Sequence, residues 1–591
     1  MDYYIFKDGL QVGPFSLEQL RKMVSGKTIS EDSFAKISGG PQDGQCLKIG
    51  KILADQPDQK IKTAEFLSSG NGGSIRIACP DCGQHYSVTE DLFKATVFKC
   101  SKCGIKFKLP PRADSTTEFI SNIPYVDLDS DIPDGDLLCP HCWKSFDQDY
   151  ILYISVHPSL YGDPILGEYA PKRFMPTVFN QMGQPLDERG LPATEMACPR
   201  CHLRIPSGLL DKPSLYFSIA GATSSGKSYF LTCLTHQLRK TLPEYFDAAF
   251  FDADPELNAT LNSYEKQLFM SLKPDEITSL PATQISGEGI SDRIRLDDID
   301  IELPKPFVFD FRQNGDENDL NMIFYDNSGE MFIPGRDEWV NQATFHLSHS
   351  NGIVFLFDPV NDASMRLDLC DERDPQVSKN PRAVDQTILL NEMINRIRRH
   401  ANMHSSDSCK IPLVIAIGKY DTWRNKFPLN MTETPYITKR KGWQDEEEYL
   451  LAMDNIYQVS YTLREMMLNY VPGLVNAAES FFDNVFFIPV SNFGTFAEQK
   501  TDGTIGVTPA KISPIWVDVP ILLLLAQNEQ IPVAKCPASN TAILGQIIKD
   551  KIVFTHPANG KIIRLPICYA GAEIELNGSK YRFPDVRKTV K

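Results

Sequence analysis

Residues 215–230 constrain the fold of this chain more than any other stretch. An apolar run from Leu215 to Ala220 leads into Gly221-x-x-x-x-Gly226-Lys227-Ser228, and apolar residues at helical spacing follow at positions 230, 231, 234 and 238. A strand, a glycine loop and a helix in this order are the context of a phosphate-binding loop. The backbone N–H groups of such a loop surround a polyphosphate, and the helix N-terminus adds partial positive charge. The pattern predicts an α/β P-loop domain with a mostly parallel sheet and a site for a nucleoside triphosphate.

The motif predicts roles for individual loop residues. Lys227 can reach the β- and γ-phosphates, and the Ser228 hydroxyl can bind Mg²⁺. The other candidates for nucleotide binding in the loop are Gly221, Thr223, Ser224, Ser225 and Gly226.

A second predicted strand, residues 322–325, ends in Asp326-Asn-Ser-Gly329-Glu330. The Asp326 carboxylate is expected in the Mg²⁺ shell, because an aspartate at a strand end beside the loop can reach the ion. Gly329 is expected to present its N–H to the γ-phosphate.

Three further apolar runs end in polar residues. Residues 353–357 end at Asp358, residues 413–417 at Gly418-Lys419-Tyr420-Asp421, and residues 485–490 at Ser491-Asn492. In this order the strand ends resemble the motifs of GTPases of the translation-factor-related class. The resemblance implies that Lys419 lies along a guanine base, and that Asp421 pairs with the guanine N1–H and exocyclic amine, which adenine does not present. It also implies that the backbone near Ser491 and Asn492 meets the guanine O6.

Two positions in this resemblance concern hydrolysis. A threonine between Ser228 and Asp326 is expected to sense the γ-phosphate and bind Mg²⁺; Thr283 is the candidate, with Thr278 second. Glu330 stands where many GTPases have a water-orienting Gln. A carboxylate is repelled by a triphosphate but can act as a base or hold the water, and a solvent-facing position is the other interpretation. The candidate catalytic residues are therefore Lys227, Asp326, Gly329 and Glu330.

Eight of the fourteen cysteines form four Cys-x-x-Cys pairs. Cys79/Cys82 and Cys100/Cys103 are separated by 17 residues, a spacing typical of a zinc ribbon, and predict one structural Cys₄ zinc site. Cys139/Cys142 and Cys198/Cys201 are separated by 55 residues, so the segment between them must fold on its own. A second shared zinc is predicted there; two redox pairs or separate sites are the alternatives. Cys₄ zinc fits a reducing compartment, and a cytoplasmic location is expected.

The first 55 residues resemble a GYF-like domain of the second type, through Tyr3-Tyr-Ile-Phe6, Gly13-Pro-Phe15 and Leu20. The resemblance implies a surface for proline-rich peptides, and a structural cap is the alternative. The predicted order of modules is a GYF-like domain (1–55), a linker (56–75), a zinc ribbon (76–110), an acidic linker (111–136), a second Cys₄ zinc unit (137–210), a P-loop GTPase domain (211–530) and a small β-rich module (531–591). Hairpins are expected in the last module at Asn559-Gly560 and Asn577-Gly578.

The region 137–530, with its Cys-Pro-His-Cys, Cys-Pro-Arg-Cys-His and Gly-Ala-Thr-Ser-Ser-Gly-Lys-Ser motifs, looks like the double-GTPase family of bacterial conflict systems. The resemblance implies a regulatory, Mg²⁺-dependent GTPase that works beside partner proteins in defence against phage. Because Gly418 stands where most relatives have Asn or Thr, a P-loop ATPase stays open as the alternative. A nucleotide-gated scaffold with little turnover is the alternative from another class.

Charge and hydropathy restrict the partners. A net charge of −16 argues against general affinity for nucleic acid or anionic membranes. The longest apolar run, residues 519–526, is too short to span a bilayer and predicts a buried helix with Pro520 in its first turn.

Protein purified without added metal is expected to contain about two zinc ions per chain, because four Cys-x-x-Cys pairs supply two sets of four thiolates. Elemental analysis measures this, and Cys79→Ser and Cys139→Ser are each expected to remove about one ion. One zinc in the unmodified protein would exclude the widely spaced site; none, with disulfides in its place, would also exclude the reducing compartment.

Overall fold

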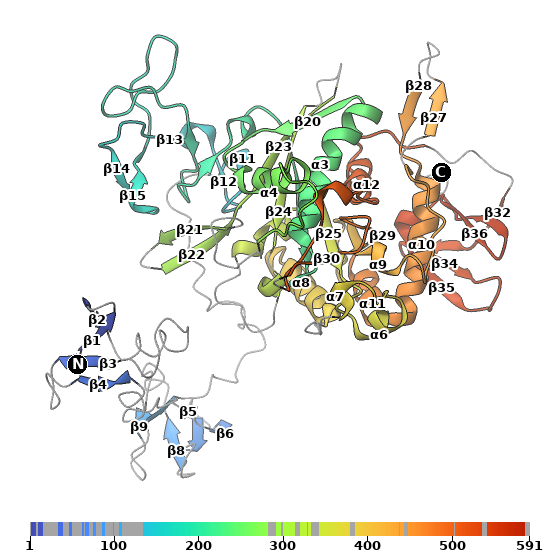
Figure 1. The fold of residues 1–591 in the computed structure, drawn as a ribbon, viewed down its shortest axis with the longest axis horizontal. Coiled ribbons are helices and arrows are strands. Elements are labelled where there is room, and N and C mark those ends of the chain that lie inside the picture. The colour runs from blue at the N-terminus through green and yellow to red at the C-terminus, as the bar shows by residue number, and fades with distance from the viewer. Residues whose placement is uncertain are drawn as a thin grey trace. The chain divides into compact units, whose positions relative to one another are not determined.

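The computed structural model (Figure 1) divides the chain into two units, Met1–Asn122 and Ile123–Lys591. In the first unit it describes ten short strand segments. In the second it describes residues 134–281, 291–296, 299–313, 319–327, 329–332, 342–378, 385–435, 438–441, 447–501, 503–534 and 541–585.

The first unit contains three small sheets, antiparallel except for the parallel pair β5 and β10. Its N-terminal sheet has the order β2-β1-β3-β4, with the strands β1 (Asp2–Lys7), β2 (Leu10–Phe15), β3 (Phe34–Ser38) and β4 (Cys46–Lys48). A second sheet has the order β6-β7-β8, and a third has the order β5-β10-β9. Their bounds are β5 (Lys62–Thr63), β6 (Glu65–Ser69), β7 (Ile75–Ala78), β8 (His85–Val88), β9 (Phe98–Lys99) and β10 (Lys106–Lys108).

Residues 56–75, predicted as a linker, therefore contain β5 and β6. The polar glycine stretch at 70–73, which suggested a linker, lies between β6 and β7, which pair with each other. These strands are short and contain polar residues. The alternation of apolar and polar residues that indicates a strand is therefore too weak to be recognised in the sequence.

The centre of the second unit is a seven-stranded sheet of order β20-β23-β24-β19-β25-β26-β29. The five strands from β24 to β29 are parallel, and β23 is antiparallel to both of its neighbours. Every residue of β24, β25, β26 and β29 is buried, as expected for parallel strands covered on both faces. The strands are β19 (Ser214–Gly221), β20 (Ala248–Asp252), β23 (Phe307–Gln313), β24 (Leu320–Asp326), β25 (Gly352–Phe357), β26 (Leu413–Ile417) and β29 (Val485–Pro489).

Helices cover both faces of this sheet (Figure 1), with α3 (Lys227–Tyr245), α4 (Ala259–Phe269) and α12 (Val519–Gln527) on one side. On the other side lie α8 (Gln386–His400), α10 (Met453–Tyr470) and α11 (Pro472–Phe481). The predicted buried helix with Pro520 in its first turn is confirmed as α12. Shorter elements are α6 (Ala363–Asp368), α7 (Pro375–Ser378), α9 (Tyr420–Trp423), the 3₁₀ turns η4 (Gly329–Phe332) and η5 (Gln342–Ser348), and the hairpins β27–β28 (Thr438–Lys441, Glu447–Leu450) and β30–β31 (Glu498–Gln499, Ile505–Gly506).

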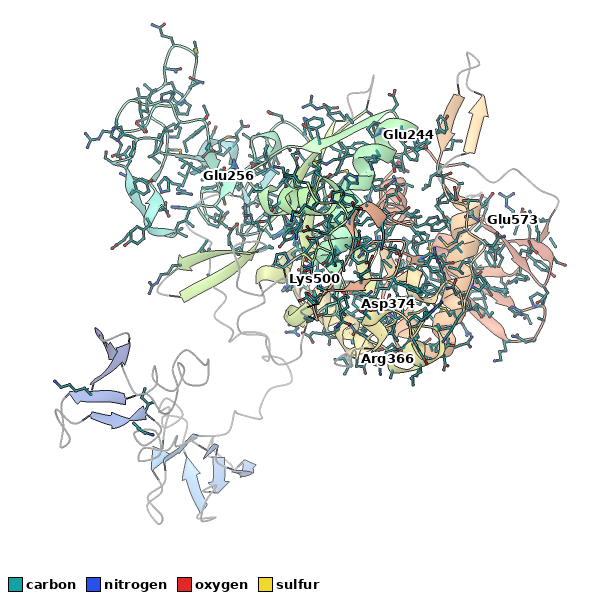
Figure 2. The ribbon with its side chains drawn as sticks, viewed as in Figure 1. Glu244, Glu256, Arg366, Asp374, Lys500 and Glu573 are labelled. Atoms are coloured by element: carbon teal, nitrogen blue, oxygen red, sulfur yellow. The ribbon has the colours of Figure 1, made fainter. Side chains whose placement is uncertain are left out.

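The second cysteine unit precedes β19 and is not closed on itself. Its strands are β11 (Leu137–Leu138), β12 (Ser145–Phe146), β13 (Leu152–Ile154), β14 (Tyr161–Asp163), β15 (Gly167–Pro171), β16 (Arg173–Phe174), β17 (Met196–Ala197) and β18 (Arg204–Ile205). Its apolar residues share one core with Ile294 and Ile301 of the hairpin β21–β22 (Ser291–Leu296, Ile299–Pro304) and with Ile323 and Tyr325 of β24. Glu256 of the α/β domain, labelled in Figure 2, pairs with Arg204 at 3.1 Å. The unit is thus packed onto the sheet.

A small β module ends the described chain. Its strands are β32 (Ala542–Ile543), β33 (Gln546–Ile548), β34 (Lys551–Thr555), β35 (Ile562–Pro566), β36 (Glu573–Leu576) and β37 (Ser579–Arg582). Both predicted hairpins are confirmed: β34 pairs with β35, and β36 pairs with β37 across Asn577-Gly578, whose φ values of 51° and 75° suit a tight hairpin turn. The module packs on α10, where the Ser460 and Tyr569 hydroxyls lie 2.6 Å apart.

Asp518, just before α12, is a buried carboxylate at 2% exposure that accepts a hydrogen bond from Thr241 Oγ1 at 2.8 Å. Burial raises its pKa to about 6. Since the unfolded chain ionises at a lower pH, the folded state loses stability as pH rises from about 4 through 6. Asp518→Asn keeps an acceptor for Thr241 and is expected to stabilise the protein at pH 7.5 by on the order of 1–3 kcal/mol, with the gain vanishing near pH 4.

Urea unfolding at both pH values measures this difference. Asp368→Asn, an exposed aspartate at the end of α6, is the control and should change little. A destabilised Asp518→Asn variant at pH 7.5 would show that the ionised carboxylate is required.

Candidate functional site

The carboxyl ends of the parallel strands surround two neighbouring cavities. The larger, of about 560 Å³, is lined by the loop between β19 and α3 and also by Ser279, Leu280 and Pro281. The smaller, of about 110 Å³, lies beside it and shares Gly226 and Lys419 among its lining residues. The cavities together offer a polar, loop-lined part and a narrower part bounded by Asp421 and Phe493.

The predicted strand–loop–helix unit is confirmed: β19 ends at Gly221, and α3 begins at Lys227. Gly226 has φ of 87°, a conformation that glycine adopts without strain. Lys227 Nζ donates to the carbonyl oxygens of Gly221 (3.0 Å) and Ala222 (2.7 Å). Burial lowers the pKa of Lys227 to about 8, against the effect of Asp326 and Asp358. An anion in the larger cavity would offset the cost of desolvation by electrostatic attraction and favour the charged ammonium.

Asp326 ends β24 beside the start of α3. Its Oδ2 accepts a hydrogen bond from the Ser228 hydroxyl at 2.9 Å, and its Oδ1 is buried without a partner among the described residues. Burial raises the pKa of this carboxyl. A hydroxyl and a carboxylate with an unsatisfied oxygen are hard ligands of the kind Mg²⁺ takes, so these two residues fit the predicted ion.

Gly329 lies against the loop between β19 and α3. A Cβ at this position would come within 2.3 Å of Thr223 N and 2.6 Å of Ala222 C, so no larger residue fits without moving the loop. The strand-end loop after β24 is therefore in direct contact with the loop after β19, as a γ-phosphate sensor requires.

Asp421 lies in α9, at 3% exposure, and lines the smaller cavity. Its Oδ1 accepts a hydrogen bond from the Ser491 hydroxyl, whereas its Oδ2 has no partner among the described residues. Burial raises its pKa to about 6. A buried carboxylate with one oxygen left over is suited to accept hydrogen bonds from a ligand in this cavity.

Residue 418, in the loop that carries Asp421, is a glycine, so contacts from other residues stabilise this loop. Trp423 Nε1 donates to Gly418 O at 2.9 Å, and Lys419 Nζ pairs with Asp358 Oδ2 at 2.7 Å. A Cβ at position 418 would lie 3.3 Å from Phe357 O. The buried indole of Trp423 thus steadies the loop where most of the resembled GTPases use an Asn or Thr side chain.

The other predicted nucleotide-binding residues lie around these groups. Thr223 and Ser224 line the larger cavity, while Ser225 and Asn492 line the smaller one. Ser225 Oγ and Asn492 Oδ1 are buried without partners among the described residues. Ser491 is fully buried behind Asp421 and contributes its hydroxyl to that carboxylate.

Several lining residues were missed in the sequence. Tyr229 and Gln376 line both cavities, and Ile505 of β31 closes them from another segment. The Tyr229 hydroxyl accepts a hydrogen bond from Leu280 N at 2.7 Å and thereby holds the segment over the larger cavity. Of these residues, Tyr229 alone was identifiable from the sequence, because it directly follows the glycine-loop motif.

The four cysteines of the second unit meet in one buried cluster. Cys139 Sγ lies 3.7 Å from Cys201 Sγ, Cys142 Sγ lies 3.8 Å from Cys198 Sγ, and all four sulfurs lie within 4.8 Å of one another. Four thiolates about 2.3 Å from a zinc ion have tetrahedral edges of about 3.8 Å, so the cluster fits zinc. Backbone N–H groups of His141 and Arg200 point to sulfurs at 3.4 Å. Each pair turns through a left-handed residue that is not glycine, Trp143 (φ 58°) and His202 (φ 60°).

Some predicted site residues lie outside the described residues. These are Thr283 and the four cysteines Cys79, Cys82, Cys100 and Cys103; Glu330 belongs to η4, but its side chain is not described. Thr278, the second candidate for the γ-phosphate sensor, accepts a hydrogen bond from Gln267 Nε2 at 2.7 Å and pairs through its backbone with Val507. Among the described helices, none combines the length and apolar character needed to cross a membrane.

Comparison with known protein families identifies a domain at the N-terminal end of the chain. Residues 3–39 match the family model described as GYF domain 2, which confirms that resemblance. A search of curated proteins found no match. The resemblance of region 137–530 to the double-GTPase family stays a prediction.

Matches among solved structures include translation elongation factor SelB from Methanococcus maripaludis in complex with the GTP analogue GppNHp, at 12% identity, 61% coverage of this chain, 44% of that chain and a TM-score of 0.19. Era from Aquifex aeolicus bound to GDP and AlF₄⁻ matches at 14% identity, 55% coverage of this chain, 58% of that chain and a TM-score of 0.20. The chain spans about half the length of these proteins, and likeness at this level supports no conclusion about function.

Lys227→Ala is expected to abolish triphosphate binding, because it removes the cation at the base of the larger cavity. Titration with a fluorescent triphosphate measures this, and zinc content should not change. Lys240→Ala, an exposed lysine on the same helix, is the control and should bind as the unmodified protein does. Equal binding by Lys227→Ala would remove the phosphate-loop assignment.

Proposed function

We propose that this chain is a Mg²⁺-dependent GTP-binding and GTP-hydrolysing switch. The observation that carries the proposal is Asp421: a buried carboxylate with one unpartnered oxygen, in a cavity that adjoins the phosphate-binding loop. Guanine offers two N–H donors on one edge to such a carboxylate.

The phosphates would occupy the larger cavity. Lys227 would exchange its two carbonyl acceptors for β- and γ-phosphate oxygens, and the loop N–H groups would complete the anion site. Ser228 and Asp326 would hold Mg²⁺, which supplies charge neutralisation to the phosphates when bound. A buried lysine and a buried aspartate, each with its pKa displaced by burial, then both gain charged partners.

Hydrolysis needs a water in line with the γ-phosphate. Gly329, whose Cα packs against Thr223 N, would donate its N–H to that phosphate. We assign water orientation to Glu330 and Mg²⁺ contact in the triphosphate state to Thr283. A carboxylate is a poor substitute for the amide of Gln beside a triphosphate, so turnover is expected to be slow.

GTP and ATP binding require different protonation states of Asp421. Adenine N1 is an acceptor and would need this carboxyl protonated. Burial raises the pKa of Asp421 to about 6, so the carboxyl is mostly ionised at pH 7, and the ionised form suits the two N–H donors of guanine. A scaffold that binds GTP with little turnover has the same binding site and differs only at Glu330.

A regulatory switch needs a partner, and we propose proteins rather than nucleic acid. The acidic net charge disfavours a polyanion, and the GYF domain 2 match supports recognition of proline-rich peptide. Membership of a bacterial conflict system in the cytoplasm, in defence against phage, belongs to this proposal and rests on the sequence resemblance.

Asp421→Asn is expected to weaken GTP binding by about 1.5–3 kcal/mol, because a charged acceptor is lost in a buried site. The same variant is expected to gain xanthosine triphosphate, whose C2 carbonyl accepts from the new amide while its N1–H still donates. Competition titrations with GTP, ATP and xanthosine triphosphate measure both effects. Asp368→Asn is again the control.

The pH dependence adds an independent readout. GTP affinity of the unmodified protein should fall as pH drops through 6, because Asp421 must lose its proton to accept both hydrogen bonds. Equal affinity for ATP and GTP, unchanged in Asp421→Asn, would replace the guanine assignment with the ATPase.

A further inference from the structure

A continuous chain of buried polar groups runs behind the strand-end loop of β24. Ser218 Oγ lies 2.6 Å from both His346 Nδ1 and Ser350 Oγ, and His346 Nε2 lies 2.9 Å from Asn327 Oδ1. All four residues are at most 5% exposed. None of them belongs to the cavities or to the predicted motifs, apart from the position of Asn327 directly after Asp326.

The partners of Asn327 determine which atoms donate. Asn327 Nδ2 donates to Ile219 O at 3.0 Å, so its Oδ1 faces the imidazole. His346 Nε2 must therefore carry a proton and donate to Asn327. Ser350 Oγ donates to His346 O at 2.8 Å, which fixes the backbone of the same histidine.

Aromatic rings fix the plane of the imidazole. The His346 ring stacks on Tyr325 at 4.5 Å and 12°, and Trp143 of the second zinc unit lies 5.5 Å from the Tyr325 ring. The Tyr325 hydroxyl donates to Pro140 O, between the ligands Cys139 and Cys142, at 2.6 Å. His346 is thus enclosed by β24 on one side and by the zinc unit beyond it.

The loop that His346 contacts is the one that touches the phosphate site. Asn327 follows Asp326, whose side chain bonds Ser228, and Gly329 packs against Thr223 N. We propose that His346 is a positioning residue of the triphosphate site: it holds Asn327 and, through it, sets Asp326 and Gly329 where a third phosphate and its Mg²⁺ meet them. This inference rests on the proposed function.

His346→Phe tests the role because phenylalanine keeps a ring for stacking on Tyr325 but has no polar atom. The variant leaves Asn327 Oδ1 and the Ser218 hydroxyl buried without this partner, so the loop is expected to move toward water. The readout is the ratio of the Kd values for GDP and a non-hydrolysable GTP analogue, measured by calorimetry on the full chain. We expect the preference for the triphosphate to fall about tenfold while the Kd for GDP changes by less than about twofold.

Two variants sharpen the comparison. His349→Phe makes the same change three residues later in the chain, at an exposed histidine that stacks on Trp143 at 5.4 Å, and should leave the ratio unchanged. His346→Gln can still donate to Asn327 and should restore most of the preference. If His346→Phe does not fold, Ser218→Ala, which removes the hydroxyl partner of Nδ1, is read in its place with a smaller shift in the same direction.

The outcomes separate this inference from the proposed function. An unmodified protein that binds neither nucleotide contradicts the proposed function. Normal nucleotide binding, with an unchanged ratio or an equal loss for GDP and the GTP analogue in His346→Phe, overturns only the positioning role, since a purely structural residue would weaken both ligands alike.

Discussion

The parallel arrangement of five neighbouring strands is the constraint on which the site depends. Parallel strands bring their carboxyl ends to one edge of the sheet, and the groups at these ends come from positions as distant as Gly221 and Ser491. Backbone pairing is satisfied within the sheet, so the loops at this edge can leave polar side-chain atoms for a ligand. The unpartnered oxygens of Asp326 and Asp421 lie in these loops.

At this edge of the sheet, buried charged side chains are desolvated and lack the partners that a ligand could supply. Burial lowers the pKa of Lys227 and raises those of Asp326 and Asp421, so the described protein places three charges where water is largely excluded. Such an arrangement lowers stability unless opposite charges and donors arrive. A magnesium-bound triphosphate with a guanine base would supply anions to Lys227, a cation to Asp326 and N–H donors to Asp421. Binding and local stability are therefore expected to be linked.

The sequence predicts an element well where the residues of that segment alone determine its local structure. The strand and helix around Gly226, the helix at Pro520 and the turn at Asn577 follow from spacing and from residues with special φ, so they were predictable. The linker at 56–75 was misread because its short strands have no apolar alternation. Tyr229 and Gln376 reach the cavities only through tertiary packing, and the bond from Trp423 to Gly418 depends on a turn geometry that no spacing indicates. His346 is the extreme case, since its contacts come from three separate segments: Ser218 of β19, Asn327 directly after β24, and Trp143 of the second cysteine unit.

The second cysteine unit packs as part of the α/β domain rather than as a separate module. Two observations lead to this view: its apolar residues share a core with β24, and Tyr325, the residue before Asp326, donates its hydroxyl to Pro140 of the first cysteine pair. Trp143 adopts a left-handed conformation, which is costly for an aromatic residue and is maintained where packing requires it. That conformation places its indole 4.7 Å from the Tyr216 ring and 5.5 Å from the Tyr325 ring, on the two strands that carry the phosphate loop and Asp326. A metal ion in this cluster is therefore expected to stabilise β19 near its start and β24 directly before Asp326.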